Sequence, residues 1–194
     1  MIKKKDFNQL KAEINQLKEH NDFGAARQYI ESNVQQLLKG TKEYIELMQL
    51  LALCTYKDPD LSPFSCLDAA FEILVQADPP QKSTNQETLG LAGAIYKRKW
   101  QFANRKQDLE RSLYYYRKGH DQNKTNNWAD GGYTAINAAF VLDFLGFQEL
   151  HEADQVGDCD HSAQEYFDQA NKIRQEIVDS VCKLFKQPDY AKKH

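Results

Sequence analysis

The chain has 194 residues, of which 41% are hydrophobic and 27% are charged, as is usual for a globular protein. Its formal net charge of −3 gives no general attraction for nucleic acid or for an anionic membrane. With only 9 glycines and 5 prolines, folds built from many short strands and tight turns are disfavoured.

No apolar run approaches the roughly 18–20 residues that a membrane span requires. The first residues, MIKKKDFNQL, are basic but lack the apolar segment of a secretory signal. The four cysteines (Cys54, Cys66, Cys159 and Cys182) are unclustered, unlike those of a disulfide framework or a structural zinc site. We therefore expect a cytoplasmic protein with buried free thiols and no membrane contact.

Apolar residues recur at spacings of three and four along nearly the whole chain, whereas period-two alternation is almost absent. This pattern predicts an all-α fold of about eight helices. The expected helices span approximately residues 6–18, 22–38, 41–56, 63–77, 84–100, 107–121, 129–146 and 161–186. We expect breaks at 79–85, at the polar turn 121–127 and at a longer acidic connection over 146–160.

Several of these helices carry a small, a large and a small residue at spacings of four and three. The four instances are Ala25–Tyr29–Ser32, Ala70–Leu74–Ala77, Ser112–Tyr116–Gly119 and Ala163–Phe167–Ala170. Small residues at this spacing let antiparallel helices approach closely, as in the second helix of a tetratricopeptide repeat. The first-helix pattern is clearest at Leu89, Ala92, Gly93 and Tyr96. We predict one tetratricopeptide-like solenoid domain over residues 1–194, either complete or part of a longer array.

The segment GGYTAINAAF (131–140) raises a separate question, because Asn137 is a polar residue in an otherwise apolar helix. A middle helix of a solenoid is expected to be buried on nearly all sides. Asn137 is then either a buried amide that holds a neighbouring helix or loop, or a group that faces a binding groove.

Three segments resemble a known family: ETLGLAGAIYKRKW, LERSLYYYRKGHD and GGYTAINAAFVLDFLG, followed by ANKIRQEIVDSV. Together they are similar to the tetratricopeptide-like, TRAF-binding region of the apoptosis signal-regulating kinases and its stand-alone bacterial relatives. The matching positions are Leu89, Gly90, Lys97, Arg98, Tyr114 to Lys118 and Ile136 to Ala139, within residues 86–186. The resemblance implies an all-α repeat module for regulation and protein contacts.

The chain has no GxSxG, P-loop or GxGxxG motif, the patterns that mark common catalytic and nucleotide-binding sites. Asp154, Asp158, Asp160 and Glu165 partly match a calcium loop, but Cys159 stands where a glycine is needed. His151, Cys159 and His161 lack a fourth zinc ligand at suitable spacing. Cys66 lies near a helix start that could lower its pKa, although packing is the favoured role. We predict no catalytic residue, no metal and no cofactor.

The segment YKRKWQFANRK (96–106) carries five basic and two further aromatic side chains after its first tyrosine. The favoured interpretation places Lys97, Arg98 and Lys99 in the last turn of a helix, where cations complement the helix dipole. The alternatives are that the segment binds an acidic protein partner or that it binds nucleic acid. Of these two, we expect the acidic protein partner. Among Tyr114, Tyr115 and Tyr116, Tyr114 or Tyr115 should face solvent or a groove, because one helical face cannot hold three consecutive residues.

The leading hypothesis is a non-catalytic scaffold that binds a protein or peptide segment in the concave groove of the array. The predicted partner-binding residues are Glu87, Gly90, Ala94, Lys97, Arg98, Tyr133 and Asn137. Lys97 and Arg98 would make the groove basic at one end, which suits an acidic segment. The alternatives are an all-α enzyme or small-molecule sensor with a pocket around Asn137, Tyr133 and the acidic loop, and oligomerisation through an apolar outer face of helix 161–186.

Overall fold

The computed structural model describes residues 6–156 and 162–185, and all regular secondary structure in these ranges is helical. This confirms the predicted all-α class, with eight helices in the described residues. The chain divides into two compact units, Met1–Ser83 and Thr84–His194. A single repeat domain over 1–194 stays a prediction.

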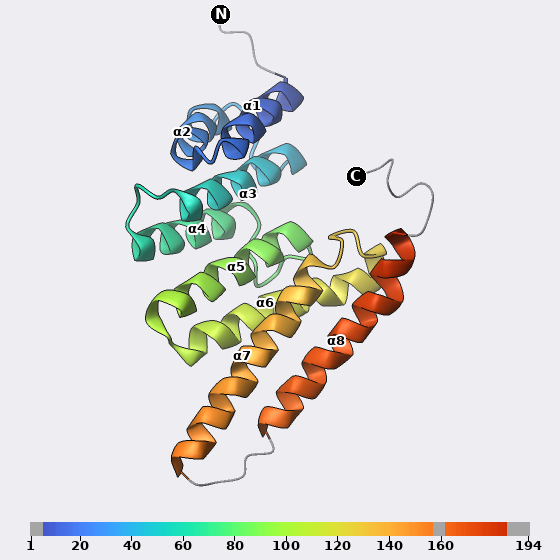
Figure 1. The fold of residues 1–194 in the computed structure, drawn as a ribbon. Helices are drawn as coiled ribbons and strands as arrows, with labels where there is room; N and C mark the ends of the chain where they lie inside the picture. Colours follow the sequence, from blue (N-terminus) through green and yellow to red (C-terminus); the bar gives the residue numbers. More distant parts are fainter. Residues whose placement is uncertain (1–5, 157–161, 186–194) are drawn as a thin grey trace, which may run out of the picture. The chain divides into compact units, whose positions relative to one another are not determined.

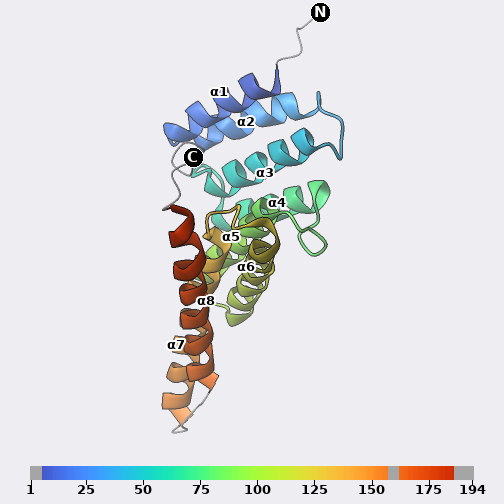
Figure 2. The ribbon, with the colours of Figure 1, turned by 90° about the vertical axis from the view of Figure 1, so that its right-hand side faces the viewer.

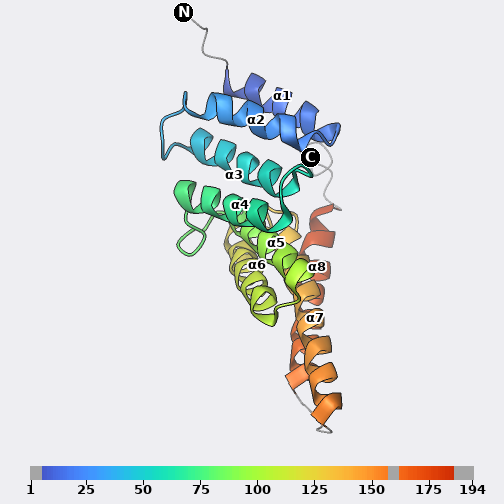
Figure 3. The same cartoon turned by 90° about the vertical axis from the view of Figure 1, so that its left-hand side faces the viewer.

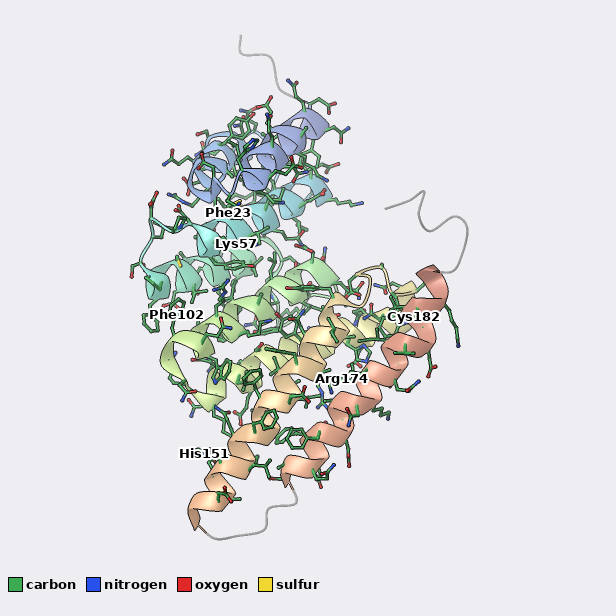
Figure 4. All side chains as sticks on the ribbon, in the orientation of Figure 1. Phe23, Lys57, Phe102, His151, Arg174 and Cys182 are labelled. Atoms are coloured by element: carbon green, nitrogen blue, oxygen red, sulfur yellow. The ribbon has the colours of Figure 1, made fainter. Side chains whose placement is uncertain are left out.

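Unit 1 contains two helix pairs (Figure 1). They are α1 (Phe7–Glu19) with α2 (Phe23–Val34), and α3 (Lys42–Lys57) with α4 (Pro63–Ala77). Figures 2 and 3 show the four helices stacked in this order, with α2 against α3. Asp58, buried just after α3, accepts a hydrogen bond of 2.9 Å from Arg27 Nε of α2. Lys57 Nζ lies 5.1 Å from the ring centroid of Phe23 beside this ion pair (Figure 4).

Unit 2 contains the other two helix pairs. They are α5 (Gln86–Ala103) with α6 (Lys106–Asn126), and α7 (Tyr133–Val156) with α8 (Ser162–Phe185). Helix α7 contacts α5, α6 and α8, so its inner faces supply much of the core of the unit. The buried core residues of α7 are Ala135, Ala138, Ala139, Val141, Leu142 and Leu145.

Polar side chains set where several helices begin. Asn85 Oδ1 accepts from the backbone N–H groups of Glu87 and Thr88, at 2.9 and 3.3 Å, and so caps α5. The carboxylate of Asp130 accepts from the N–H groups of Gly132 and Thr134, at 2.8 and 2.9 Å, ahead of α7. These bonds satisfy donors that the first turn of a helix leaves without a partner.

The helices of unit 2 approach closely at small residues. A Cβ atom added at Gly93 of α5 would lie 2.7 Å from Tyr116 Cδ1 of α6, and one at Gly119 would lie 2.6 Å from Thr134 Cγ2 of α7. Ser112 Oγ donates a 2.8 Å hydrogen bond to the Gly93 carbonyl across the same contact. The predicted small–large–small pattern thus marks real close approaches, with the fully buried Tyr116 as the large residue.

The predicted polar turn at 121–127 is wrong, because α6 continues to Asn126. The side chain of Asn123 is buried in this additional length, and its Oδ1 accepts from Gln86 Nε2 of α5. The helix ends where Asn127 and Trp128 take left-handed backbone angles, with φ of 54° and 57°. The polar residues of this segment therefore continue the helix, because their side chains form hydrogen bonds with α5.

The predicted acidic connection at 146–160 is wrong over its first part, because α7 continues to Val156. Gly146 stands inside the helix at a close contact with α8, where an added Cβ would lie 2.8 Å from Phe167 Cε1. The carboxylates of Glu149 and Glu152 hold Lys106 Nζ of α6 at 2.6 and 3.4 Å, which supports the additional turns. Figures 1 and 3 show α7 and α8 running past the loop that joins α5 to α6.

Two further boundaries differ from expectation. Helix α2 ends at Val34 rather than near residue 38. Helix α5 continues to Ala103 and ends at Asn104, whose φ of 50° is left-handed. Lys97, Arg98 and Lys99 therefore do not lie in the last turn of α5, and the predicted role in complementing its dipole is wrong.

Gly93→Ala should lower the free energy of unfolding by about 1–2 kcal/mol. The added methyl group would overlap three atoms of the Tyr116 ring at 2.7–2.8 Å, a cost of about 2–3 kcal/mol, while alanine recovers about 1 kcal/mol of helix propensity. Urea denaturation followed by circular dichroism measures the difference.

Gly24→Ala is the matched control, because its methyl group meets Asp58 at an ordinary 3.4 Å. That variant should be as stable as wild type or slightly more stable. Equal stability of Gly93→Ala and wild type would contradict the close packing at Tyr116.

Candidate partner-binding surface

Lys97 and Asn137, both predicted site residues, meet between α5 and α7. Lys97 Nζ donates a 2.7 Å hydrogen bond to Asn137 Oδ1. Asn137 Nδ2 donates a 2.9 Å hydrogen bond to the backbone carbonyl of Tyr133, one turn earlier in α7. Both side chains are half-buried. Asn137 therefore ties two helices together and is still open to solvent on one side.

The ammonium group of Lys97 is surrounded by aromatic rings instead of carboxylates. Its Nζ lies 5.6 Å from the Tyr116 ring centroid and 5.1 Å from that of Phe140. Burial, and then the charge of neighbouring Arg98, lower the pKa of Lys97. In the part of the chain that the structure describes, no carboxylate pairs with it. Cation–π contacts offset some of the lost hydration but supply no opposite charge.

Tyr133 covers the predicted site residue Gly90. A Cβ atom at Gly90 would lie 3.1 Å from Tyr133 Cε1, so glycine lets the ring lie directly on α5. The ring also meets Tyr116 edge-on, at 6.2 Å between centroids. Burial raises the pKa of Tyr133, although the nearby Tyr116 side chain opposes this shift. One side of the ring remains exposed.

The structure therefore sorts the predicted residues into three groups. Gly90 and Ala94 are buried and lie beneath the surface, so they shape it without forming it. Lys97 and Asn137 are half-buried, while Glu87, Arg98 and Tyr133 are exposed. We use the term α5–α7 face for the surface that Glu87, Lys97, Arg98, Tyr133, Asn137 and Phe140 form.

A stripe of exposed apolar side chains along α7 was missed by the sequence analysis. Its members are between 41% and 59% exposed. They are Tyr133, Ile136, Phe140, Phe147 and Leu150. The prediction that this helix is buried on nearly all sides is thus wrong, because these side chains stay largely exposed even though Tyr133 meets α5 and Phe147 meets Phe167 of α8. The available signal was the spacing of these residues, which continues beyond the predicted end at 146.

The tyrosine run behaves as predicted, with Tyr114 exposed and Tyr115 and Tyr116 buried. Tyr114 lines a hollow of about 510 Å³ along α6, together with Arg117 and Asp121. A second hollow of about 300 Å³ lies between α6 and α8, where Glu176 Oε2 is 2.9 Å from His120 Nε2. Neither hollow is lined by Asn137 or Tyr133, the residues predicted for a small-molecule pocket.

The described residues contain no cluster of three or more His, Cys, Asp or Glu side chains that could hold a metal. The predicted loop residues Asp158, Cys159, Asp160 and His161 lie outside the described residues. The helix start near Cys66 could have lowered its pKa, but burial raises the pKa of the thiol despite the backbone hydrogen bonds, which agrees with the favoured packing role. None of the described helices has both the length and the apolar character that a membrane span requires.

Comparison with known families assigns this architecture. The sequence model of the tetratricopeptide repeats-sensor family matches residues 10–142, more than half of the chain. The chain belongs to the tetratricopeptide repeats-sensor family. This confirms the resemblance to the tetratricopeptide-like region of the apoptosis signal-regulating kinases and extends it into the first 85 residues. No curated protein and no solved structure matches significantly.

Family membership supports a role in protein interaction or sensing, which is the coarse function of this repeat type. Repeat families of this kind are generally not enzymes. A helical array offers side chains on rigid helices, and these suit recognition of another chain.

Lys97→Met should leave the free energy of unfolding at pH 7 unchanged or raise it by up to about 1 kcal/mol. The variant keeps the aliphatic packing and removes the cost of a half-buried charge. As pH rises toward 10.5, the unfolded wild-type chain binds more protons than the folded one, so wild type should gain stability relative to the variant. Urea denaturation at pH 7 to 10.5 measures both effects.

Lys183→Met, which removes a lysine from an exposed position on α8, is the control variant in the same denaturation series. A wild-type stability that falls relative to Lys97→Met over this pH range would contradict the burial of the Lys97 charge.

Cys54 should react with a maleimide at least about a hundredfold more slowly than exposed Cys182 at pH 8. Burial raises the pKa of Cys54 to about 11, and the thiolate is the reactive form. Mass spectrometry of the two cysteine peptides at timed intervals gives both rates. Labelling of Cys54 as fast as of Cys182 in the folded protein would contradict the structure.

Proposed function

We propose that the protein is a non-catalytic interaction module whose α5–α7 face binds an acidic segment of a protein partner. The observation that carries the proposal is the half-buried Lys97 ammonium, which pairs with an amide and two rings but with no described carboxylate. A charge held in this way costs stability until an anion meets it.

A purely structural role for Lys97 explains less. A glutamine could donate to Asn137 Oδ1, and a methionine could pack on Tyr116, without the desolvation of a cation. Arg98, exposed on the next residue, adds a second charge beside the site and can bind a carboxylate with two parallel hydrogen bonds. The two cations together favour an anionic group on the partner.

Nucleic acid is a weaker candidate because the basic segment does not present a continuous positive surface. Lys99 Nζ lies 4.9 Å from the ring centroid of Tyr96. Arg105 pairs with Asp108 at 2.7 Å, and Lys106 pairs with Glu149 at 2.6 Å. Nucleic-acid binding by charge needs several cations free to meet phosphates.

A cytoplasmic setting and a regulatory role complete the proposal. Cys54, Cys66 and Cys182 are free thiols, which suits a reducing compartment. The α5–α7 face, which lies within unit 2, is the surface that we propose contacts the partner.

Affinity capture from a lysate of the source organism should recover a protein with wild type and lose it with Lys97→Met/Arg98→Gln. The double variant removes both cations without introducing a repulsive charge, and circular dichroism confirms that it stays helical. Recovered proteins are identified by mass spectrometry.

The matched control is Lys172→Met/Lys183→Met, which removes two exposed cations from α8 and should capture the same protein as wild type. Equal capture by Lys97→Met/Arg98→Gln and wild type would overturn the proposal. Capture of no protein by any chain would favour the small-molecule sensor, to be tested by thermal shift with a ligand library.

A further inference from the structure

The exposed apolar stripe of α7 has the spacing of a helix–helix contact. We use the term α7 seam for Tyr133, Ile136, Phe140, Phe147 and Leu150. The residues alternate at spacings of three and four, with one position, residue 143, left out. Apolar side chains at such spacing form the contact line of two helices that pack at a shallow angle.

The omitted position is occupied by Asp143, whose carboxylate is bound by Arg174 of α8. Figure 4 places Arg174 between α7 and α8. A single polar group within an apolar contact line fixes the register in which a second helix can pack. The apolar side chains of the α7 seam can thus contribute affinity for a second helix, and its one polar position can fix the register of that helix.

A helix suits this surface better than an extended segment. The backbone N–H and C=O groups within α7 are paired inside the helix, so they offer no edge to an extended chain. The seam side chains are almost entirely apolar, and they cannot replace the water that the backbone of an extended segment would lose. A helix brings its own backbone hydrogen bonds and buries only side chains.

We infer that the α7 seam docks an amphipathic helix of the protein partner, with an acidic residue beside its apolar stripe that meets Lys97 and Arg98. The inference rests on the proposed function and specifies the partner's structure. Charge complementarity selects this occupant, because Lys97 of α5 reaches Asn137 and the ring of the seam residue Phe140, and the charge of exposed Arg98 acts on Lys97.

The length of the seam sets the length of the helix. Tyr133 and Leu150 are 17 residues apart in α7, or about 26 Å along the axis. A partner helix of about 17 residues, with apolar side chains at spacings of three and four, covers this length.

Site-directed photo-crosslinking tests the inference. The photoreactive residue p-benzoylphenylalanine replaces Ile136 in one sample and Leu150 in another, and the lysate of the source organism is irradiated with each. Both positions are exposed, and they are 14 residues or about 21 Å apart on α7. Crosslinked peptides are sequenced by mass spectrometry.

Crosslinks to one partner at sites about 14 residues apart would support a docked helix, because both helices rise equally per residue. Crosslinks at sites about 6 residues apart would mean an extended segment, which rises about 3.4 Å per residue, and would overturn the inference while the proposed function stands. Crosslinks between two copies of this chain would also overturn it, since the seam would then be a dimer contact.

The control places the same photoreactive residue at Tyr114, an exposed position of α6 whose neighbouring hollow contains no seam residue, and should give no crosslink to that partner. Phe147→Glu should reduce the crosslinking yield at Ile136 by about tenfold or more, because it sets a charge within the apolar contact. If capture still depends on Lys97 and Arg98 but neither seam position crosslinks, the helix-docking inference fails and the proposed function survives. If capture does not depend on Lys97 and Arg98 and neither seam position crosslinks, the proposed function itself fails.

Discussion

The close approach of α5, α6 and α7 at Gly93 and Gly119 determines the arrangement of unit 2. Because neither glycine has a side chain, Tyr116 fits completely between the helices and Thr134 lies against α6. The same Tyr116 ring then forms the floor below Lys97 and meets Tyr133 edge-on. The α5–α7 face is therefore built on the tightest packing in the unit, which gives its side chains a rigid support.

Lys97 opposes the rest of this packing, because a half-buried cation without a described counter-charge does not favour folding. Its neighbours compensate only in part, through the Asn137 oxygen and the two aromatic rings. Local conflicts of this kind are tolerated where they serve a function, since a neutral side chain would satisfy the fold at lower cost. Under the proposed function, stability and binding make opposite demands on Lys97.

Helix α7 has two faces with different roles. Its inner face supplies alanines and branched residues to the core, while its outer face exposes the α7 seam. In α8, by contrast, Ile173 and Val181 are buried, and the exposed residues are mostly polar. The predicted apolar outer face therefore belongs to α7 and not to α8, because α8 uses its apolar stripe against its own pair-mate.

Spacing and composition alone determined the all-α class, the helix pairs and the exposure of one of Tyr114 and Tyr115, because these follow from the periodicity of one helix. The sequence also singled out Lys97 and Asn137, but not that they bind each other across 40 residues. Only the tertiary structure decided where α6 and α7 end, since Gln86, Lys106 and Phe167 stabilise those turns from other helices. It also decided which apolar residues of α7 stay exposed: a helix that is apolar on most sides does not indicate which side another helix covers, and burial depends on that neighbour.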